Sequence, residues 1–178
     1  MRKRNDKIIQ RGATLIELLL YIAIVSIFSG FLTYSVVALI NNYKRIQTRN
    51  DVLNNVSAVF STMAEEIRSA RLLYLPASVF GGGQGQVSLR TKRSVPDGED
   101  WTYVDFYLDN QRVYLKREGV AAFPITSDRV SISWLEFVKI GTGTTTASIK
   151  VDLTIAPNMA ASNPFYFTKN FSLTAGLR

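Results

Sequence analysis

The sequence predicts an α+β protein in which a long N-terminal helix packs on a C-terminal antiparallel β-sheet. Residues 13–71 contain no proline and only one glycine, Gly30, so no strong breaker interrupts a helix there. After Pro76 the apolar residues alternate with period two, in segments separated by turn residues. Because the helical half precedes the strand-rich half, the order is typical of an α+β unit.

The first part of the predicted helix is apolar all round. It covers residues 13–40, which is 28 residues, and Glu17 is its only charged side chain. At ~1.5 Å per residue such a helix is about 42 Å long, which exceeds the ~30 Å hydrocarbon core of a bilayer. The run therefore predicts a single membrane span that tilts or emerges at one end.

Residues 41–75 are expected to form the amphipathic outer half of the same helix, which should run from about Thr14 to Arg71. Its apolar residues follow one another at steps of seven, three, four, three and four: Ile46, Leu53, Val56, Phe60, Met63 and Ile67. Charged residues fall mainly between them. The pattern persists for only about three heptads, so packing on the chain's own sheet is favoured over a coiled-coil dimer.

Residues 76–178 are expected to form an extracytoplasmic β domain. Residues 81–85 are rich in glycine and suggest a flexible connection; no Lys-Ser/Thr pair follows, which argues against a phosphate-binding loop. Asp109, Asn110 and Gln111 supply the turn of a hairpin. Strands are predicted at residues 87–90, 101–108, 113–115, 130–140, 149–155 and 165–174. Sequential strand pairs favour an antiparallel sheet.

The basic charge is concentrated at the N-terminus. The net charge is +7, from 21 basic and 14 acidic residues, and residues 1–12 contribute five basic residues and one acid, which leaves +3 for the rest. Basic residues also flank the far end of the apolar run: Lys44, Arg45 and Arg49. Five basic residues before the apolar run against three after it predict a protein of the cytoplasmic membrane, with a cytoplasmic N-terminus and an extracytoplasmic remainder.

The composition argues against catalysis. The chain has no cysteine and no histidine, which excludes disulfides, thiolate metal sites and histidine-dependent triads. No pair of acids has an interpretable catalytic spacing. We expect a protein that is not an enzyme and that has no cofactor and no metal site.

The junction between the leader and the apolar run is the most specific motif. It reads Arg11-Gly12-Ala13-Thr14-Leu15-Ile16-Glu17. A carboxylate within a membrane-length apolar run is costly and usually functional. The junction resembles the cleavage and methylation site of type IV prepilins and type II secretion pseudopilins. Major pilins usually carry phenylalanine where this chain has Ala13, so the resemblance favours a minor subunit.

The resemblance implies a processing and assembly pathway. A prepilin peptidase would cut between Gly12 and Ala13 and methylate the new amine of Ala13. Glu17 would then pair with the N-terminal ammonium of an adjacent subunit and set the axial register of the helices. The implied partners are that peptidase, other pilin or pseudopilin subunits, an inner-membrane assembly platform and membrane lipid. The remaining motif residues are Thr14, Leu15 and Ile16.

The C-terminal half shows a weaker resemblance. The segment from Glu65 to Ala70 and the ending at residues 171–178 resemble the larger minor pseudopilins of the J type and the tip pilins of the W type. An initiating tip complex is one implied role. Protein secretion, motility, adhesion and DNA uptake are all functions of machines in this family, and these alternatives stay open at this point.

Other interpretations compete with this one. A cleavable secretory signal would have a shorter apolar core, and a plain signal anchor on a monomeric binding protein leaves Glu17 unexplained. A DNA-uptake (competence) pseudopilin would need basic residues on one face to contact phosphates. The candidates are Arg90, Lys92, Arg93, Arg112, Lys116 and Arg117. An acidic loop of Asp97, Glu99 and Asp100 around Gly98 suggests calcium only weakly, because the twelve-residue ligand spacing is absent.

Overall fold

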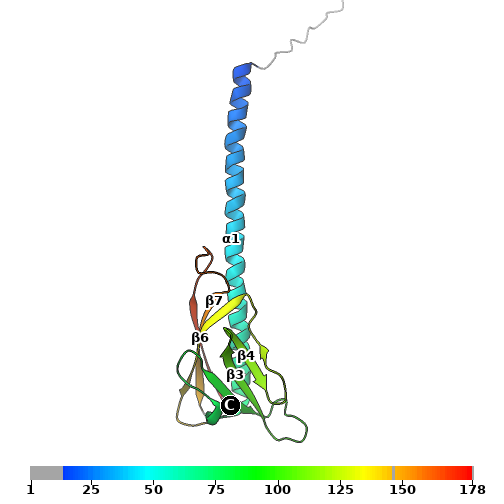
Figure 1. Cartoon of the computed structure of the whole chain (residues 1–178), viewed down its shortest axis with the longest axis vertical. Coiled ribbons are helices and arrows are strands. Elements are labelled where there is room, and N and C mark those ends of the chain that lie inside the picture. The colour runs from blue at the N-terminus through cyan, green and yellow to red at the C-terminus, as the bar shows by residue number, and fades with distance from the viewer. Residues whose placement is uncertain (1–13, 146, 178) are drawn as a thin grey trace, which may run out of the picture. The chain divides into compact units, whose positions relative to one another are not determined.

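The computed structural model describes residues 14–145 and 147–177. The chain divides between Lys44 and Arg45 into two compact units. Helix α1 (Leu15–Ser69) is 55 residues long and contributes to both units (Figure 1). The prediction of one uninterrupted helix is confirmed. Its bounds lie within two residues of the expected ones.

The described part of the first unit contains the apolar part of α1, whose large apolar side chains are exposed. By length and composition, this helix is able to cross a membrane, and none of its most apolar stretch is buried within the chain. Ser26, Thr33 and Ser35 donate their hydroxyl hydrogen bonds to carbonyls four residues back, at 2.8 to 2.9 Å. These hydroxyls are therefore satisfied without water, as a lipid environment requires.

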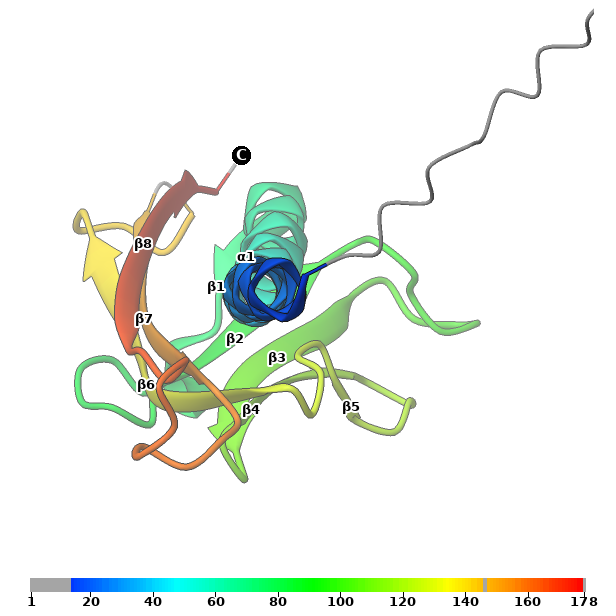
Figure 2. The same ribbon diagram turned by 90° about the horizontal axis from the view of Figure 1, so that it is seen from above.

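The second unit contains two antiparallel sheets and the C-terminal part of α1. One sheet has the order β1 (Ala70–Leu73), β2 (Gln86–Thr91), β3 (Thr102–Asp109), β4 (Arg112–Arg117) and β5 (Phe123–Pro124). The other has the order β6 (Val130–Ile140), β7 (Ser148–Pro157) and β8 (Lys169–Gly176). A short 3-10 helix, η1 (Leu75–Ala77), follows β1. In Figure 2 the two sheets lie on different sides of the C-terminal part of α1.

One face of α1 joins the two sheets into a single core. The face consists of apolar residues at steps of four, three, four and four: Val52, Val56, Val59, Met63 and Ile67. Phe106 and Leu115 from the first sheet and Phe137 and Leu153 from the second belong to the same buried cluster. The prediction that the outer half of the helix packs on the chain's own sheet structure is confirmed. The arrangement of a long N-terminal apolar helix on antiparallel sheets is pilin-like.

The prediction of which helix residues face the core was wrong at the N-terminal end of that face. Ile46 and Leu53 are 58% and 50% exposed, whereas Val52 is 1% exposed. Successive helical residues are about 100° apart, so a shift of one position turns the face toward a different side. The buried core of the helix begins only at Val52.

The predicted helix end and several strand predictions need correction. Ala70 and Arg71 do not end the helix but begin β1, because Ala70 is buried opposite Thr91 of β2. The sequence missed β1 and β5, and its single expected sheet is two sheets. The last strand begins at Lys169 rather than at residue 165. Alanine and arginine favour helix, so tertiary pairing overrides local preference here.

The glycine-rich stretch is not a flexible connection. The amides of Gly81 and Gly85 donate to carbonyls of β6, and the Gly83 carbonyl accepts from the Leu135 amide, at 2.8 to 3.1 Å. A Cβ on Gly83 would lie 2.4 Å from the Trp134 ring. Glycine at this position therefore allows the backbone to pass against that ring.

The predicted hairpin between β3 and β4 is confirmed. Asn110 and Gln111 have φ angles of 45° and 60°, and Asp109 pairs with Arg112. Two consecutive left-handed residues match the right-handed twist of the flanking strands, which is why such turns are favoured in two-residue hairpins.

Two adjacent glutamates tie the end of α1 to the first sheet. Glu66 is 3% exposed, and its Oε1 accepts a hydrogen bond from the Arg117 guanidinium of β4 at 2.6 Å. Glu65 makes a 2.5 Å pair with Arg93, in which both side chains are largely exposed. A buried carboxylate requires a cation, so the Glu66–Arg117 pair fixes the end of the helix against β4.

Arg117→Met is predicted to lower the free energy of unfolding by about 3–5 kcal/mol, because it leaves the Glu66 carboxylate buried without a cation. Urea unfolding of the full chain in detergent, followed by the fluorescence of the two tryptophans, measures the loss. Arg93→Met is the matched control, and we expect a much smaller loss because its pair is solvated. Equal losses in the two variants would contradict the role of the buried pair.

Asp152 is predicted to contribute to the acid sensitivity of the β6–β8 sheet. Hydrogen bonds from Lys150 and Ser172 hold the pKa of the Asp152 carboxyl below its ordinary value. The stability that Asp152 contributes is therefore fully present above the ordinary carboxyl pKa, and it is lost as the pH falls through the lowered pKa. Asp152→Asn should reduce the difference in unfolding free energy between pH 7 and pH 3. An unchanged difference would contradict this assignment.

Candidate functional site

The predicted processing site is only partly within the described residues. Gly12 and Ala13, the expected cleavage and methylation positions, lie outside them. Thr14 immediately precedes α1, and its carbonyl accepts hydrogen bonds from the amides of Glu17, at 3.0 Å, and Leu18, at 3.1 Å. Thr14 therefore begins the hydrogen bonding of the helix, and Glu17 lies in its first turn.

The position of Glu17 suits a negative charge. The first turn of a helix presents unpaired amides and a partial positive charge, which stabilise a carboxylate by about 0.3–1 kcal/mol. The Glu17 side chain is exposed and has no hydrogen-bond or ion-pair partner among the described residues. No described residue therefore neutralises the Glu17 carboxylate.

The surroundings of Glu17 are apolar and uncovered. Leu15 and Ile16 are 77% and 75% exposed. The large apolar side chains that follow on α1 are also roughly half exposed or more: Leu18, Leu19, Leu20, Tyr21 and Ile22. A continuous exposed apolar surface of this kind is typical of a site of contact with membrane or protein. The carboxylate would then be removed from water together with these neighbours.

The candidate DNA-contacting residues are mostly engaged within the chain. Arg93 and Arg117 form ion pairs with the two glutamates at the end of α1. The Arg90 guanidinium and the Lys92 ammonium lie 4.4 and 4.5 Å from the centre of the Trp101 ring. Four of the six predicted residues thus have partners already. These four side chains are therefore not free cations that could contact the phosphates of DNA.

The acidic loop is an exposed turn. Gly98 has a φ of 88°, and the Glu99 amide donates to the Pro96 carbonyl at 3.2 Å. Within the described part of the chain, no three acidic side chains come close enough together to hold a metal ion. The loop gives no support to a calcium site.

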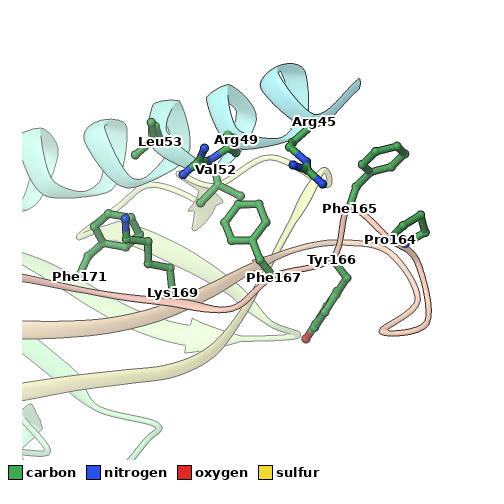
Figure 3. Close-up of a pocket in the computed structure, with 10 residues that line it drawn as sticks. All are labelled: Arg45, Arg49, Val52, Leu53, Pro164, Phe165, Tyr166, Phe167, Lys169 and Phe171. Atoms are coloured by element: carbon green, nitrogen blue, oxygen red, sulfur yellow. The ribbon is translucent and has the colours of Figure 1, made fainter. Parts of the chain in front are cut away.

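The sequence analysis missed a groove in the second unit, which we call the aromatic–basic groove. It is about 430 Å³ in volume and lies between α1, the segment before β8 and β8 itself (Figure 3). Its lining residues are Arg45, Arg49, Val52, Leu53, Pro164, Phe165, Tyr166, Phe167, Lys169 and Phe171. Basic residues after the apolar run and the aromatic run at residues 165–167 are both visible in the sequence. Their proximity depends on the tertiary fold.

Comparison of the chain with models of known families, with curated proteins and with solved structures finds no match. The resemblance to pilins therefore rests on two observations. One is the motif from Gly12 to Glu17, and the other is the long apolar helix on antiparallel sheets.

Proposed function

We propose that this chain is a minor pilin or pseudopilin, a structural subunit of a type IV pilus or of a type II secretion pseudopilus. The observation that carries the proposal is the position of Glu17. It lies five residues after Gly12, in the first turn of a 55-residue helix whose apolar part is uncovered. A carboxylate at this position fits assembly through packed helices better than a simple anchor, which needs no acid.

The precursor is a single-pass membrane protein with its N-terminus in the cytoplasm. A prepilin peptidase removes residues 1–12 by cutting the Gly12–Ala13 bond and methylates the amine of Ala13. Cleavage takes away the five basic residues that orient the precursor and creates one new cation at the helix terminus. The chain thereby gains the positive charge that the Glu17 carboxylate lacks.

Pairing between subunits then sets the register of the helices. Glu17 lies in the first turn of α1, so it stays near the membrane edge before assembly and the cost of its charge there is modest. Packed helices exclude water, and an unpaired buried charge costs several kcal/mol. Pairing with the Ala13 ammonium of an adjacent subunit removes that cost. An axial slip between the two helices would leave both charges unpaired.

The second unit supplies the contacts that distinguish this subunit from others. It faces the extracytoplasmic side and is suited to surface contacts, which include those of an initiating tip complex. The J-type or W-type assignment belongs to this proposal. A DNA-uptake pseudopilin is less favoured because most of its candidate cations are engaged. A monomeric signal-anchored binding protein would retain its leader and would not need Glu17.

Glu17→Ala and Glu17→Gln are predicted to be processed normally but to enter filaments about 100-fold less well, because each leaves the partner ammonium buried and unpaired. The measurement is the amount of mature subunit in sheared filaments relative to membranes, in cells that contain the assembly machinery.

Glu118→Ala is the matched control, since Glu118 is an exposed glutamate in the second unit. We expect incorporation at the level of the unmodified chain. Incorporation of Glu17→Ala at that same level would refute the register role. Failure of Glu17→Ala to be processed would place the residue in peptidase recognition instead.

A further inference from the structure

The aromatic–basic groove has an excess of positive charge that the chain does not neutralise. Arg45, Arg49 and Lys169 line it, and none of its ten lining residues, all of them described, is acidic. Neither Arg45 nor Arg49 has a hydrogen-bond or ion-pair partner among the described residues. By contrast, Arg93, Arg117 and Arg129 each pair with an acid. The groove is therefore electrostatically suited to an anion.

The walls of the groove are apolar and aromatic. Phe165, Phe167 and Phe171 are partly buried, and Tyr166 is 37% exposed. Figure 3 shows the Phe167 ring between the two arginines on α1 and the backbone before β8. The Lys169 ammonium lies 5.5 Å from the centre of the Phe171 ring. A small inorganic anion would leave these rings without a partner, so the walls fit an anion that carries an apolar portion.

The arginines lie just beyond the apolar run on the same helix. Arg45 follows Ile40 by five residues, about 8 Å at ~1.5 Å per residue. Arg49 lies about one turn further along the helix, and Figure 3 shows both arginine side chains on the side of α1 that faces Phe167. The polar region of a bilayer extends about 5–8 Å beyond the hydrocarbon core on each side. Tyr43, which is 68% exposed, is a residue type enriched at that depth.

We propose that the aromatic–basic groove binds the headgroup of an anionic phospholipid in the extracytoplasmic leaflet. The phosphate lies among Arg45, Arg49 and Lys169, where its negative charge offsets part of their positive charge. The glycerol and the first acyl carbons lie against Phe165 and Phe167. The proposal requires α1 to span the membrane, and it depends neither on cleavage at Gly12 nor on assembly into a filament.

Lipid binding to the purified full chain in detergent tests this proposal. Native mass spectrometry during titration with phosphatidylglycerol or phosphatidylcholine gives the apparent affinity for each. We expect phosphatidylglycerol to bind at least tenfold more tightly. The double variant Arg49→Gln, Lys169→Gln removes two cations, each worth about one kcal/mol near an anionic headgroup, and should weaken phosphatidylglycerol binding about 30-fold.

The matched control is the double variant Arg112→Gln, Lys116→Gln, which removes the same two charges from β4, away from the groove. It should bind phosphatidylglycerol like the unmodified chain. Because Arg49 and Lys169 are exposed, their variant should keep the same thermal unfolding midpoint.

Several results would overturn the proposal. Equal affinity of the unmodified chain for the two lipids, or equal loss in the two double variants, would show that the groove does not select an anionic headgroup. Glycerol phosphate that displaces the lipid at equal concentration would show that the groove takes a free anion. A dimer that dissociates on Arg49→Gln, Lys169→Gln, with no lipid preference, would assign the groove to a second copy of the chain.

Discussion

Burial of one face of α1, from Val52 to Ile67, is the constraint on which the rest of the second unit depends. Each sheet turns one apolar face inward, and both faces close on this stretch of helix. Polar contacts orient it at both ends. At one end Asn55 accepts a hydrogen bond from the Ser127 amide at 2.7 Å, and at the other Glu66 pairs with Arg117. Loss of the helix face would expose both sheets at once.

Packing within the first unit does not cover the apolar N-terminal part of the same helix. Residues from Leu15 to Ile40 have no sheet to pack against within the first unit, and their apolar side chains stay exposed. Lipid and neighbouring helices are two environments that cover such a surface, and a subunit that is first anchored and then assembled uses both in turn. In the proposed function Glu17 distinguishes the second environment from the first, because the terminal ammonium of a neighbouring subunit neutralises it where water is excluded.

Features that depend on local periodicity were predicted well from the sequence. Helix α1, β6 at residues 130–140 and the turn at Asn110 and Gln111 follow from patterns within a few residues. Features that depend on distant pairing were not. Ala70 joins a strand because Thr91 lies opposite, and Val52 replaces Leu53 in the core because of where the sheets end. The aromatic–basic groove requires residues more than a hundred positions apart, so no single segment could indicate it.

The N-terminal peptide of the mature protein from native membranes tests the central claim most directly. Mass spectrometry of that peptide reports both the cut and the modification of the new terminus. The account predicts a peptide that begins at Ala13 and is heavier by one methyl group on its amine. A peptide that begins at Met1, or a terminus elsewhere without the methyl group, would contradict it.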